Sequence, residues 1–187
     1  MNLDQETLCS LASTLGSDIP FFFNGGIQLC FGRGEILEKL DSNFKYGVIL
    51  LKNPNVSVST GETYKKYSNR FCDQYLPDRE MIEKIRINLR NNGLNDLNFD
   101  NQHLSIKNDL QLVVENENDS VNQALYLLSS LNNCLTFSMS GSGPTCFAIF
   151  KDFDTAKNEL KANYKLFKDK GYDSLVCNFL EEGITFI

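Results

Sequence analysis

The chain has 187 residues, of which 42% are hydrophobic and 22% are charged, and its formal net charge is −6. This is an ordinary globular composition, and the length suits one domain or one and a part. The negative charge argues against a general nucleic-acid binder, because no basic stripe is present to neutralise phosphates, but a small phosphorylated ligand needs only a few local donors. The longest apolar runs, Ile19–Phe23 and Tyr46–Leu51, are far shorter than a membrane helix requires, so we expect no membrane partner.

The cysteines are scattered along the chain without any C-x-x-C pair, and four of them lie inside apolar runs. We therefore expect reduced core residues of a cytoplasmic protein rather than zinc ligands or disulfides. The one histidine, His103, stands in a polar stretch without metal-ligand spacing, which favours a surface loop and predicts no metal site. The cysteines are Cys9, Cys30, Cys72, Cys134, Cys146 and Cys177.

A helix is expected at the N-terminus, where Leu8, Leu11 and Leu15 recur at helical spacing. Asp4 is placed to be its N-cap, and Gly16 follows the last apolar position. Short strands are expected next, separated by glycine-containing turns, and the last of them has the composition of a buried strand. These strands are Pro20–Phe23, Ile27–Phe31, Glu35–Leu40 and Tyr46–Leu51.

Further helices follow from apolar spacing and capping residues. One begins near Ser59 or Thr60, Pro77-Asp78 opens the next, which ends at Gly93, and Asp154 caps the last. The stretch from Asn91 to Asn118 is rich in Asn and Asp and is expected to be mostly loop. The apolar faces of the last three helices carry Ile82, Ile85 and Leu89; Val121, Ala124, Leu125, Leu128 and Leu131; and Leu160, Tyr164 and Phe167.

Two strand pairs complete the pattern. The small-residue turn S-G-S-G-P joins Cys134–Met139 to Thr145–Phe150, and Ser174–Phe179 and Ile184–Ile187 end the chain. Strands separated by helices, with hairpin-joined pairs in between, describe an α+β sandwich of the split β-α-β type. A domain boundary is expected between residues 39 and 45.

The first candidate for chemistry is the segment S-M-S-G-S-G-P-T-C-F-A-I-F, Ser138–Phe150. Its glycines allow close backbone approach, and exposed N–H groups in such a turn can cradle an anion. It lacks the G-K-[ST] of a P-loop and the spacing of a dinucleotide fingerprint. A plain tight connection between two strands explains the segment equally well.

Asp18 is the second candidate, because it lies between a helix end and the run P-F-F-F. An acidic residue in apolar surroundings costs free energy unless it is paired or used. One interpretation is an Asx-type turn or helix cap. The other is a partly desolvated carboxylate that accepts a proton from a substrate hydroxyl or orients that hydroxyl.

Thr60 and Tyr64 are the third candidate, since residues four apart face the same way on a helix. A hydroxyl and a ring near a helix start could hold a base by stacking and hydrogen bonding. The alternative is that Thr60 caps the helix and Tyr64 packs in the core.

Together these segments resemble the GHMP small-molecule kinases, whose motifs occur in the same order. The resemblance runs over nearly the whole chain through L-G-S-D-I-P-F-F-F-N-G-G-I-Q-L-C-F-G-R-G-E, K-N-P-N-V-S-V-S-T and the S-G-S-G-P-T block. The Asp18 block with its G-R-G-E turn resembles most the branch that phosphorylates 4-diphosphocytidyl-2-C-methyl-D-erythritol in the non-mevalonate isoprenoid pathway. The S-G-S-G-P-T block is shared more widely in the superfamily.

The resemblance implies transfer of the γ-phosphoryl of ATP, with Mg²⁺, to the 2-hydroxyl of that cytidine diphosphate derivative. Asp18 aligns with the catalytic aspartate, Thr60 and Tyr64 with substrate-side positions where a ring stacks on cytosine, and Gly141, Ser142 and Gly143 with the third, glycine-rich motif. The phenylalanine run would then be a strand that holds Asp18 in place. No nucleic-acid partner is implied, and the oligomeric state is left open.

The resemblance also implies a GHMP kinase fold in which residues 1–42 are a remnant of the N-terminal domain, of the ribosomal protein S5 domain 2-like type. Residues 43–187 would form a complete C-terminal domain, a ferredoxin-like α/β sandwich. An early lysine and the loop P-x-G-x-G-L-G-G-G-S-S of the family do not occur in these residues. We therefore expect an N-terminally truncated chain that is inactive by itself, since a missing set of electrostatic groups removes most of the rate.

Two other functions remain open on the sequence. One is a non-catalytic α+β ligand-binding module that kept the C-terminal fold, and the other is a different GHMP kinase, such as a homoserine or mevalonate-type kinase. A remnant without function is the third possibility.

Overall fold

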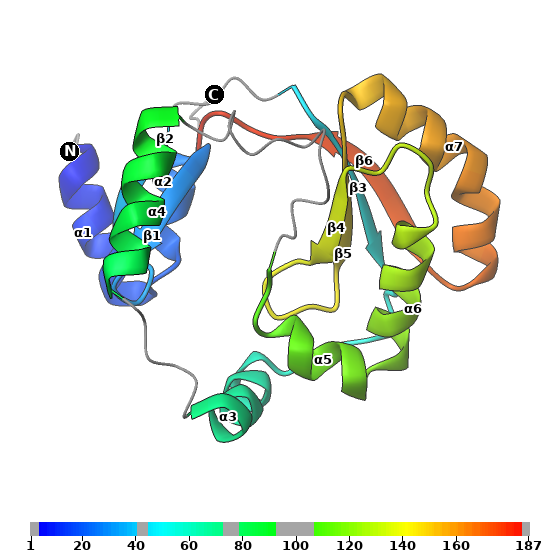
Figure 1. Cartoon of the computed structure of the whole chain (residues 1–187), viewed down its shortest axis with the longest axis horizontal. Helices are drawn as coiled ribbons and strands as arrows, with labels where there is room; N and C mark the ends of the chain where they lie inside the picture. The colour runs from blue at the N-terminus through cyan, green and yellow to red at the C-terminus, as the bar shows by residue number, and fades with distance from the viewer. Residues whose placement is uncertain (1–3, 41–44, 73–78, 93–106, 185–187) are drawn as a thin grey trace. The chain divides into compact units, whose positions relative to one another are not determined.

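A computed structural model describes residues 4–40, 45–72, 79–92 and 107–184. The chain forms two compact units (Figure 1). Unit 1 comprises Met1–Phe44, Pro77–Leu97 and Phe179–Ile187, and unit 2 comprises Lys45–Leu76 and Asn98–Asn178. The assignment of residues 1–42 and 43–187 to two family domains stays a prediction.

Unit 2 is built on a four-stranded sheet in the order β4-β5-β3-β6, in which all neighbours are antiparallel. Helices connect β3 to β4 and β5 to β6, which confirms the α+β class and the split β-α-β order. The strands are β3 (Gly47–Lys52), β4 (Thr136–Met139), β5 (Cys146–Phe150) and β6 (Asp173–Asn178). The helices are α3 (Thr60–Phe71), α5 (Gln111–Glu117), α6 (Asp119–Ser129) and α7 (Phe153–Asp169).

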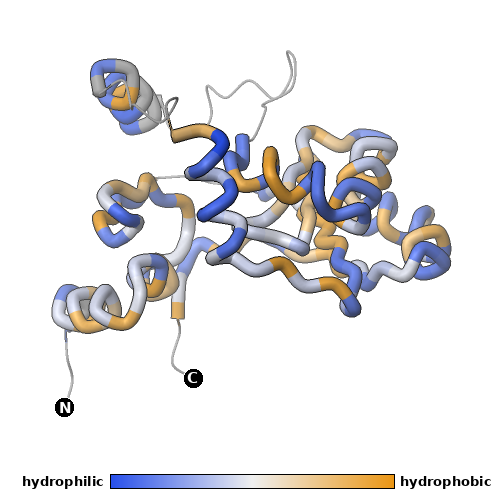
Figure 2. Tube along the Cα trace, turned by 90° about the horizontal axis from the view of Figure 1, so that it is seen from below, coloured by the Kyte–Doolittle hydropathy of each residue, from blue (hydrophilic) through white to orange (hydrophobic). Residues whose placement is uncertain are grey.

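The core of unit 2 lies between this sheet and the apolar sides of α6 and α7. Ile49, Leu51, Leu128, Phe150 and Phe167 are fully buried there. Figure 2 shows helices that alternate between hydrophilic and hydrophobic stretches, as amphipathic helices packed on one side must. The predicted apolar face of α7 is only partly correct, since Phe167 is buried but Tyr164 is half exposed.

An aspartate caps the start of one helix in each unit. The Asp4 carboxylate accepts a hydrogen bond from the N–H of Thr7 at 2.7 Å, as predicted for α1 (Gln5–Leu15). The prediction for α7 was wrong by two residues, because Asp152 accepts the N–H of Thr155 at 2.7 Å and Asp154 lies inside the first turn. These hydrogen bonds hold the pKa of Asp4 and of Asp152 below the ordinary value.

Unit 1 contains a two-stranded antiparallel sheet together with three helices. Its strands are β1 (Ile27–Phe31), as predicted, and β2 (Ile36–Leu40), which begins one residue later than predicted. Its helices are α1, α2 (Ile19–Asn24) and α4 (Arg79–Asn92). The predicted strand over Pro20–Phe23 is wrong, since these residues belong to α2. Pro20 lies in the first turn of α2, where its fixed φ and missing N–H favour helix initiation.

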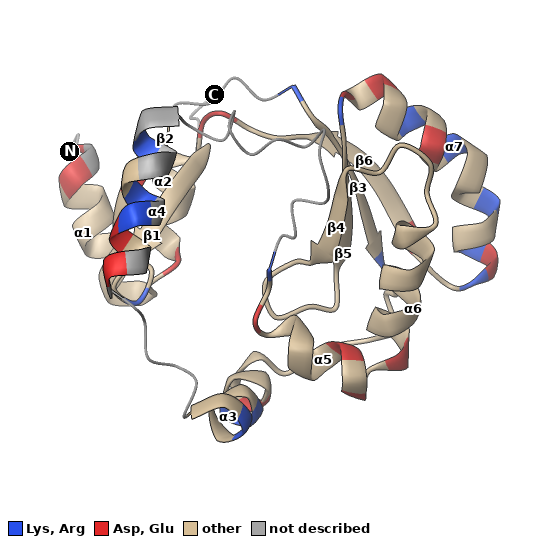
Figure 3. Cartoon of the chain, in the orientation of Figure 1, with Lys and Arg blue, Asp and Glu red and all other residues tan. Residues whose placement is uncertain are grey.

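One glutamate joins α4 to the β1–β2 sheet. Glu38, on β2, accepts a hydrogen bond from Nε of Arg86 at 3.0 Å and forms a second ion pair with Arg90. The Arg86 guanidinium also lies 4.8 Å from the ring centre of Phe31. Figure 3 shows positions of both charge signs along α4, and the ion pairs of Arg86 and Arg90 attach this helix to β2.

Two other predictions, a loop over Asn91–Asn118 and a strand over Ile184–Ile187, fall partly outside the described residues. The stretch Asn91–Asn118 is not simply loop, because it contains α5, which begins where Asn108 caps a turn by accepting the N–H of Leu110 at 3.0 Å. Residues 93–106, with Gly93 and His103, lie outside the described residues. In the predicted strand Ile184–Ile187, Ile184 is not in a strand, and the other three residues lie outside the described ranges.

Burial separates the cysteines into two groups. Burial raises the pKa of the Cys146 thiol to about 12 and that of Cys134 to about 11, which keeps both protonated and unreactive. Cys30 and Cys72 are exposed, so the expectation of core residues holds for only part of the set. Among the described helices, none has the length and apolar composition needed to cross a membrane.

We predict that hydrogen exchange is slower in residues 134–150 than in residues 19–31. Apart from the turn at residues 140–145, the former lie mainly in β4 and β5, which contain fully buried side chains, whereas the latter comprise α2 and β1, and β1 pairs only with β2 and is mostly half-buried. Amide protection follows burial and pairing, so we expect rates at least about tenfold apart when measured by NMR or mass spectrometry. Equal protection in the two segments would contradict this prediction.

Candidate functional site

The glycine-rich turn of unit 2 joins β4 to β5. The N–H of Ser140 donates to the carbonyl of Thr145 at 2.8 Å, and the N–H of Gly143 donates to the carbonyl of Ser140 at 2.9 Å. Gly143 has φ of +83°, and a Cβ there would lie 2.7 Å from the Met139 sulfur. A glycine is therefore required at this position for both conformation and space.

The same turn presents backbone donors. Within the described part of the chain, the N–H groups of Gly141 and Ser142 donate to no protein acceptor. Gly141 has φ of +55°, and nothing lies within 4 Å of where its Cβ would be. Successive unpaired N–H groups in a turn that contains a left-handed residue form an anion-binding concavity.

The structure brings Thr60 and Ser142 together, although they are 82 residues apart in the chain. Their hydroxyl oxygens lie 2.7 Å apart, within hydrogen-bond distance. Ser59 is the N-cap of α3 and accepts the N–H of Glu62 at 3.4 Å, so Thr60 is not the cap. Tyr64, one turn further along α3, is 59% exposed, so it is not a core residue. Both purely structural alternatives for this pair are therefore wrong.

Asp18 belongs to unit 1, in the turn before α2. Asp18 occupies the N-cap position of α2, but its side chain makes no capping hydrogen bond, so the predicted side-chain cap is wrong. Its carboxylate is exposed, so the predicted partial desolvation is also wrong, and its action on a substrate hydroxyl stays a prediction. The Ser17 hydroxyl donates to Asp18 Oδ1 at 3.4 Å. A phenylalanine strand does not hold Asp18 in place, because Phe21–Phe23 are helical.

The G-R-G-E turn lies against Asp18 instead. A Cβ added to Gly34 would lie 3.1 Å from Asp18 Oδ1, and Gly34 has φ of +116°. The neighbouring Glu35 carboxylate accepts the N–H of Arg33 at 2.7 Å, which closes the turn. The left-handed backbone at position 34 favours glycine, and a Cβ there would be in tight contact with the carboxylate, which gives a structural reason for that motif.

Sequence reasoning missed the residues that support the glycine-rich turn. Asn108 Nδ2 donates to the carbonyls of Met139 at 2.7 Å and Gly141 at 2.8 Å. Gln111 Oε1 accepts the hydroxyl of Ser138 at 2.9 Å and the N–H of Met139 at 2.8 Å. The only local signal is the run N-D-L-Q at the start of α5, and that signal indicates a helix start rather than a contact with a distant turn.

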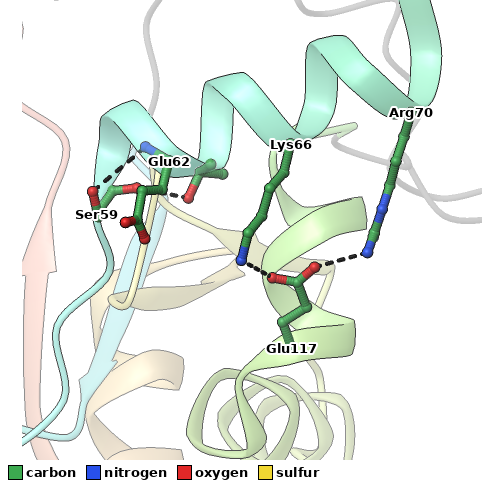
Figure 4. Close-up of polar contacts among 6 residues, drawn as sticks. Ser59, Glu62, Lys66, Arg70 and Glu117 are labelled. Atoms are coloured by element: carbon green, nitrogen blue, oxygen red, sulfur yellow. Dashed lines mark hydrogen bonds and ion pairs between the residues drawn. The ribbon is translucent and has the colours of Figure 1, made fainter.

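Sequence reasoning also missed Glu117, which forms ion pairs with two cationic side chains of α3. Glu117, at the end of α5, contacts Lys66 Nζ at 2.6 Å and an Arg70 guanidinium nitrogen at 2.8 Å (Figure 4). The hydrogen bond from Lys66 is the largest cause that holds the pKa of Glu117 below its ordinary value. Glu117 and Lys66 border an open cavity of about 150 Å³ between α3 and α5, lined also by Ser59, Glu62 and Thr63.

A metal site of protein ligands alone is not formed by these residues. Within the described ranges, no group of three or more His, Cys, Asp or Glu side chains could hold a metal ion. Mg²⁺ in phosphoryl-transfer sites is held by one or two carboxylates together with substrate phosphates and waters, and it neutralises phosphate charge there. A single carboxylate such as Asp18 is compatible with that mode of binding.

Comparison with known proteins gives a consistent result. Residues 81–169 match the family described as "GHMP kinases C terminal". The whole chain matches the 4-diphosphocytidyl-2-C-methyl-D-erythritol kinases of two Prochlorococcus marinus strains, at 87% identity for AS9601 and 86% for MIT 9312. The chain spans 60% of the length of each of these curated relatives.

Solved structures show the same fold. A homoserine kinase from Cytophaga hutchinsonii matches with a TM-score of 0.61 at 19% identity, over 97% of this chain and 60% of that one. A 4-(cytidine 5'-diphospho)-2C-methyl-D-erythritol kinase matches with a TM-score of 0.57 at 20% identity, over 95% of this chain and 58% of that one. At these identities the two matches establish the fold alone.

The ion pairs of Glu117 predict how the stability of the α3–α5 contact depends on pH. Because its pKa in the folded chain lies below the unfolded value of 4.5, the pairs contribute stability above pH 4.5, and that contribution is lost as the pH falls through the folded-state pKa. We expect the Glu117 carboxyl carbon to titrate below pH 4.5 by NMR, with the α3 amide resonances following it. In Lys66→Met the midpoint should rise, and a wild-type midpoint at or above 4.5 would contradict the prediction.

Proposed function

Because the chain belongs to the GHMP kinase family, we propose that it acts in the ATP-dependent phosphorylation of 4-diphosphocytidyl-2-C-methyl-D-erythritol at its 2-hydroxyl. The 87% identity over the whole chain to a kinase of that name supports this substrate. The observation that carries the proposal is the Thr60–Ser142 contact beside the exposed ring of Tyr64. It joins the two segments of unit 2 that carry the family motifs.

We propose that unit 2 is the C-terminal GHMP kinase domain with a ferredoxin-like topology, and that residues 1–42 belong to the N-terminal domain. The antiparallel sheet order β4-β5-β3-β6 with two helical connections supports the first assignment. Because α4 and the C-terminal segment belong to unit 1, the chain would cross between the domains more than once.

Each proposed site residue has a chemical task. The Tyr64 ring would stack on cytosine, and the Thr60 hydroxyl would hydrogen-bond on the substrate side. The free N–H groups of Gly141 and Ser142 suit a phosphate oxygen. Gly143 would keep the turn in the conformation that exposes them.

Asp18 would take or orient the proton of the 2-hydroxyl. The hydroxyl oxygen then forms a bond to the γ-phosphorus of ATP, the bond from that phosphorus to the β–γ bridging oxygen breaks, and ADP leaves. Such a transfer depends mostly on positioning and charge stabilisation, so one placed carboxylate for the nucleophile is sufficient. Its exposure supports the proposal, because a substrate alcohol must reach it.

We predict that Tyr64→Ala weakens the binding of cytidine 5'-diphosphate by about tenfold or more. Stacking of a base on an aromatic ring is worth about 1–3 kcal/mol, and alanine removes it. Isothermal titration calorimetry on the full chain measures the effect. Tyr126→Ala is the matched control, since Tyr126 is also an exposed helical tyrosine but lies on α6. Equal losses in the two variants would contradict the role of Tyr64.

We predict that Asp18→Asn lowers kcat by about 100-fold or more, because general base catalysis typically contributes that much. The assay uses a chimera in which these 187 residues replace the matched part of the 87% identical relative, with ATP and the methylerythritol substrate. Affinity for cytidine 5'-diphosphate should not change. Asp154→Asn, an exposed carboxylate on α7, is the control, and an active Asp18→Asn chimera would exclude Asp18 from catalysis.

A further inference from the structure

Helix α3 carries both proposed substrate-binding residues but has little apolar surface to hold it. Thr63 is its buried residue, and Tyr67 and Phe71 are half-buried with ring centres 4.9 Å apart. Most of its other side chains, including Thr60 and Tyr64, are exposed. A helix with so little buried surface needs other contacts to set its rotation and its position along its axis.

Glu117 supplies these contacts. Lys66 and Arg70 are four residues apart, so they lie on one face of α3, and both reach the same carboxylate from that face (Figure 4). Two charge-assisted bonds at successive turns fix the rotation of the helix and its axial position. Exposed ion pairs add little to global stability, so the consequence of this arrangement is placement rather than stability.

The other end of the same segment holds the glycine-rich turn. Asn108 donates to Met139 and Gly141 and accepts from Leu110, so both ends of its amide are engaged. It therefore fixes where the turn lies relative to the start of α5. The contact between Thr60 and Ser142 joins the turn back to α3. Contacts therefore connect α3 to Glu117 on α5, Asn108 before α5 to the turn, and the turn to α3.

We infer that the segment Asn108–Glu117 is a brace that sets the spacing between the glycine-rich turn and α3, with Asn108 and Glu117 as its positioning residues. The inference rests on the proposed function where it concerns the ligand. The brace fixes the distance from the anion-binding N–H groups to the Tyr64 ring. It would thereby select a ligand whose base and phosphates have that separation, such as a nucleoside diphosphate.

The first test needs no ligand. In the full chain, Glu117→Gln and Lys66→Ala should increase amide exchange in α3 by about tenfold and shift the Ser142 amide resonance, while β5 exchanges as in the wild type. Lys65→Ala is the matched control, because this neighbouring exposed lysine makes no contact with Glu117. Lys66→Arg should restore the wild-type values. Unchanged exchange in Glu117→Gln would overturn the brace.

The second test asks whether the two ends act together. Glu117→Gln and Asn108→Asp should each weaken cytidine 5'-diphosphate binding by about threefold to tenfold. The double variant should weaken it by less than the product of the two effects, because both residues act on the spacing between the glycine-rich turn and α3. Asn122→Asp, an exposed asparagine on α6, is the control for the amide-to-acid change. Effects that multiply independently would overturn the proposal.

The two proposals fail in different ways. If the wild-type chain does not bind cytidine 5'-diphosphate, the proposed substrate is wrong, and the exchange and resonance measurements still decide on the brace. If the wild type binds and Glu117→Gln changes neither exchange nor affinity, the brace is wrong and the substrate stands. If Asn108→Asp does not fold, Lys66→Ala and its arginine rescue carry the test.

Discussion

A glutamate that binds two cationic side chains one helical turn apart occurs in each unit and attaches a hydrophilic helix to a neighbouring element. Glu117 binds Lys66 and Arg70 of α3, and Glu38 binds Arg86 and Arg90 of α4. Each glutamate comes from a different element than its cations. Because a carboxylate has two oxygens, it can bind both cations at once and so define an orientation that a single ion pair leaves free.

This constraint explains how a polar site can be well defined. The turn at Ser140–Gly143 is fixed by two half-buried amides, and α3 is fixed by charge, so the Thr60–Ser142 contact joins two elements that are already placed. Here the N–H groups and the Tyr64 ring stay available while their supports are engaged.

Local sequence patterns correctly predicted the helices and strands whose apolar residues are the ones buried in the fold. The strand of Gly47–Lys52 and the helix with Val121 and Leu128 were predictable because their apolar periodicity matches their burial. Pro20–Phe23 was not, since three phenylalanines favour a strand but a proline in the first turn begins a helix. Motif order identified Thr60 and Ser142, whereas no local pattern links Glu117 to Lys66 across 51 residues.

The sequence singled out Asp18 as a desolvated carboxylate, and that physical reason is wrong. The apolar neighbours suggested a desolvated carboxylate, but helix formation turns those neighbours into α2 and leaves the carboxylate exposed beside Gly34. In the proposed function an exposed carboxylate is within reach of a substrate alcohol, so the proposed role of Asp18 rests on its position. Gly34 suits this position, because its backbone has φ of +116° and a side chain there would come into tight contact with the Asp18 carboxylate.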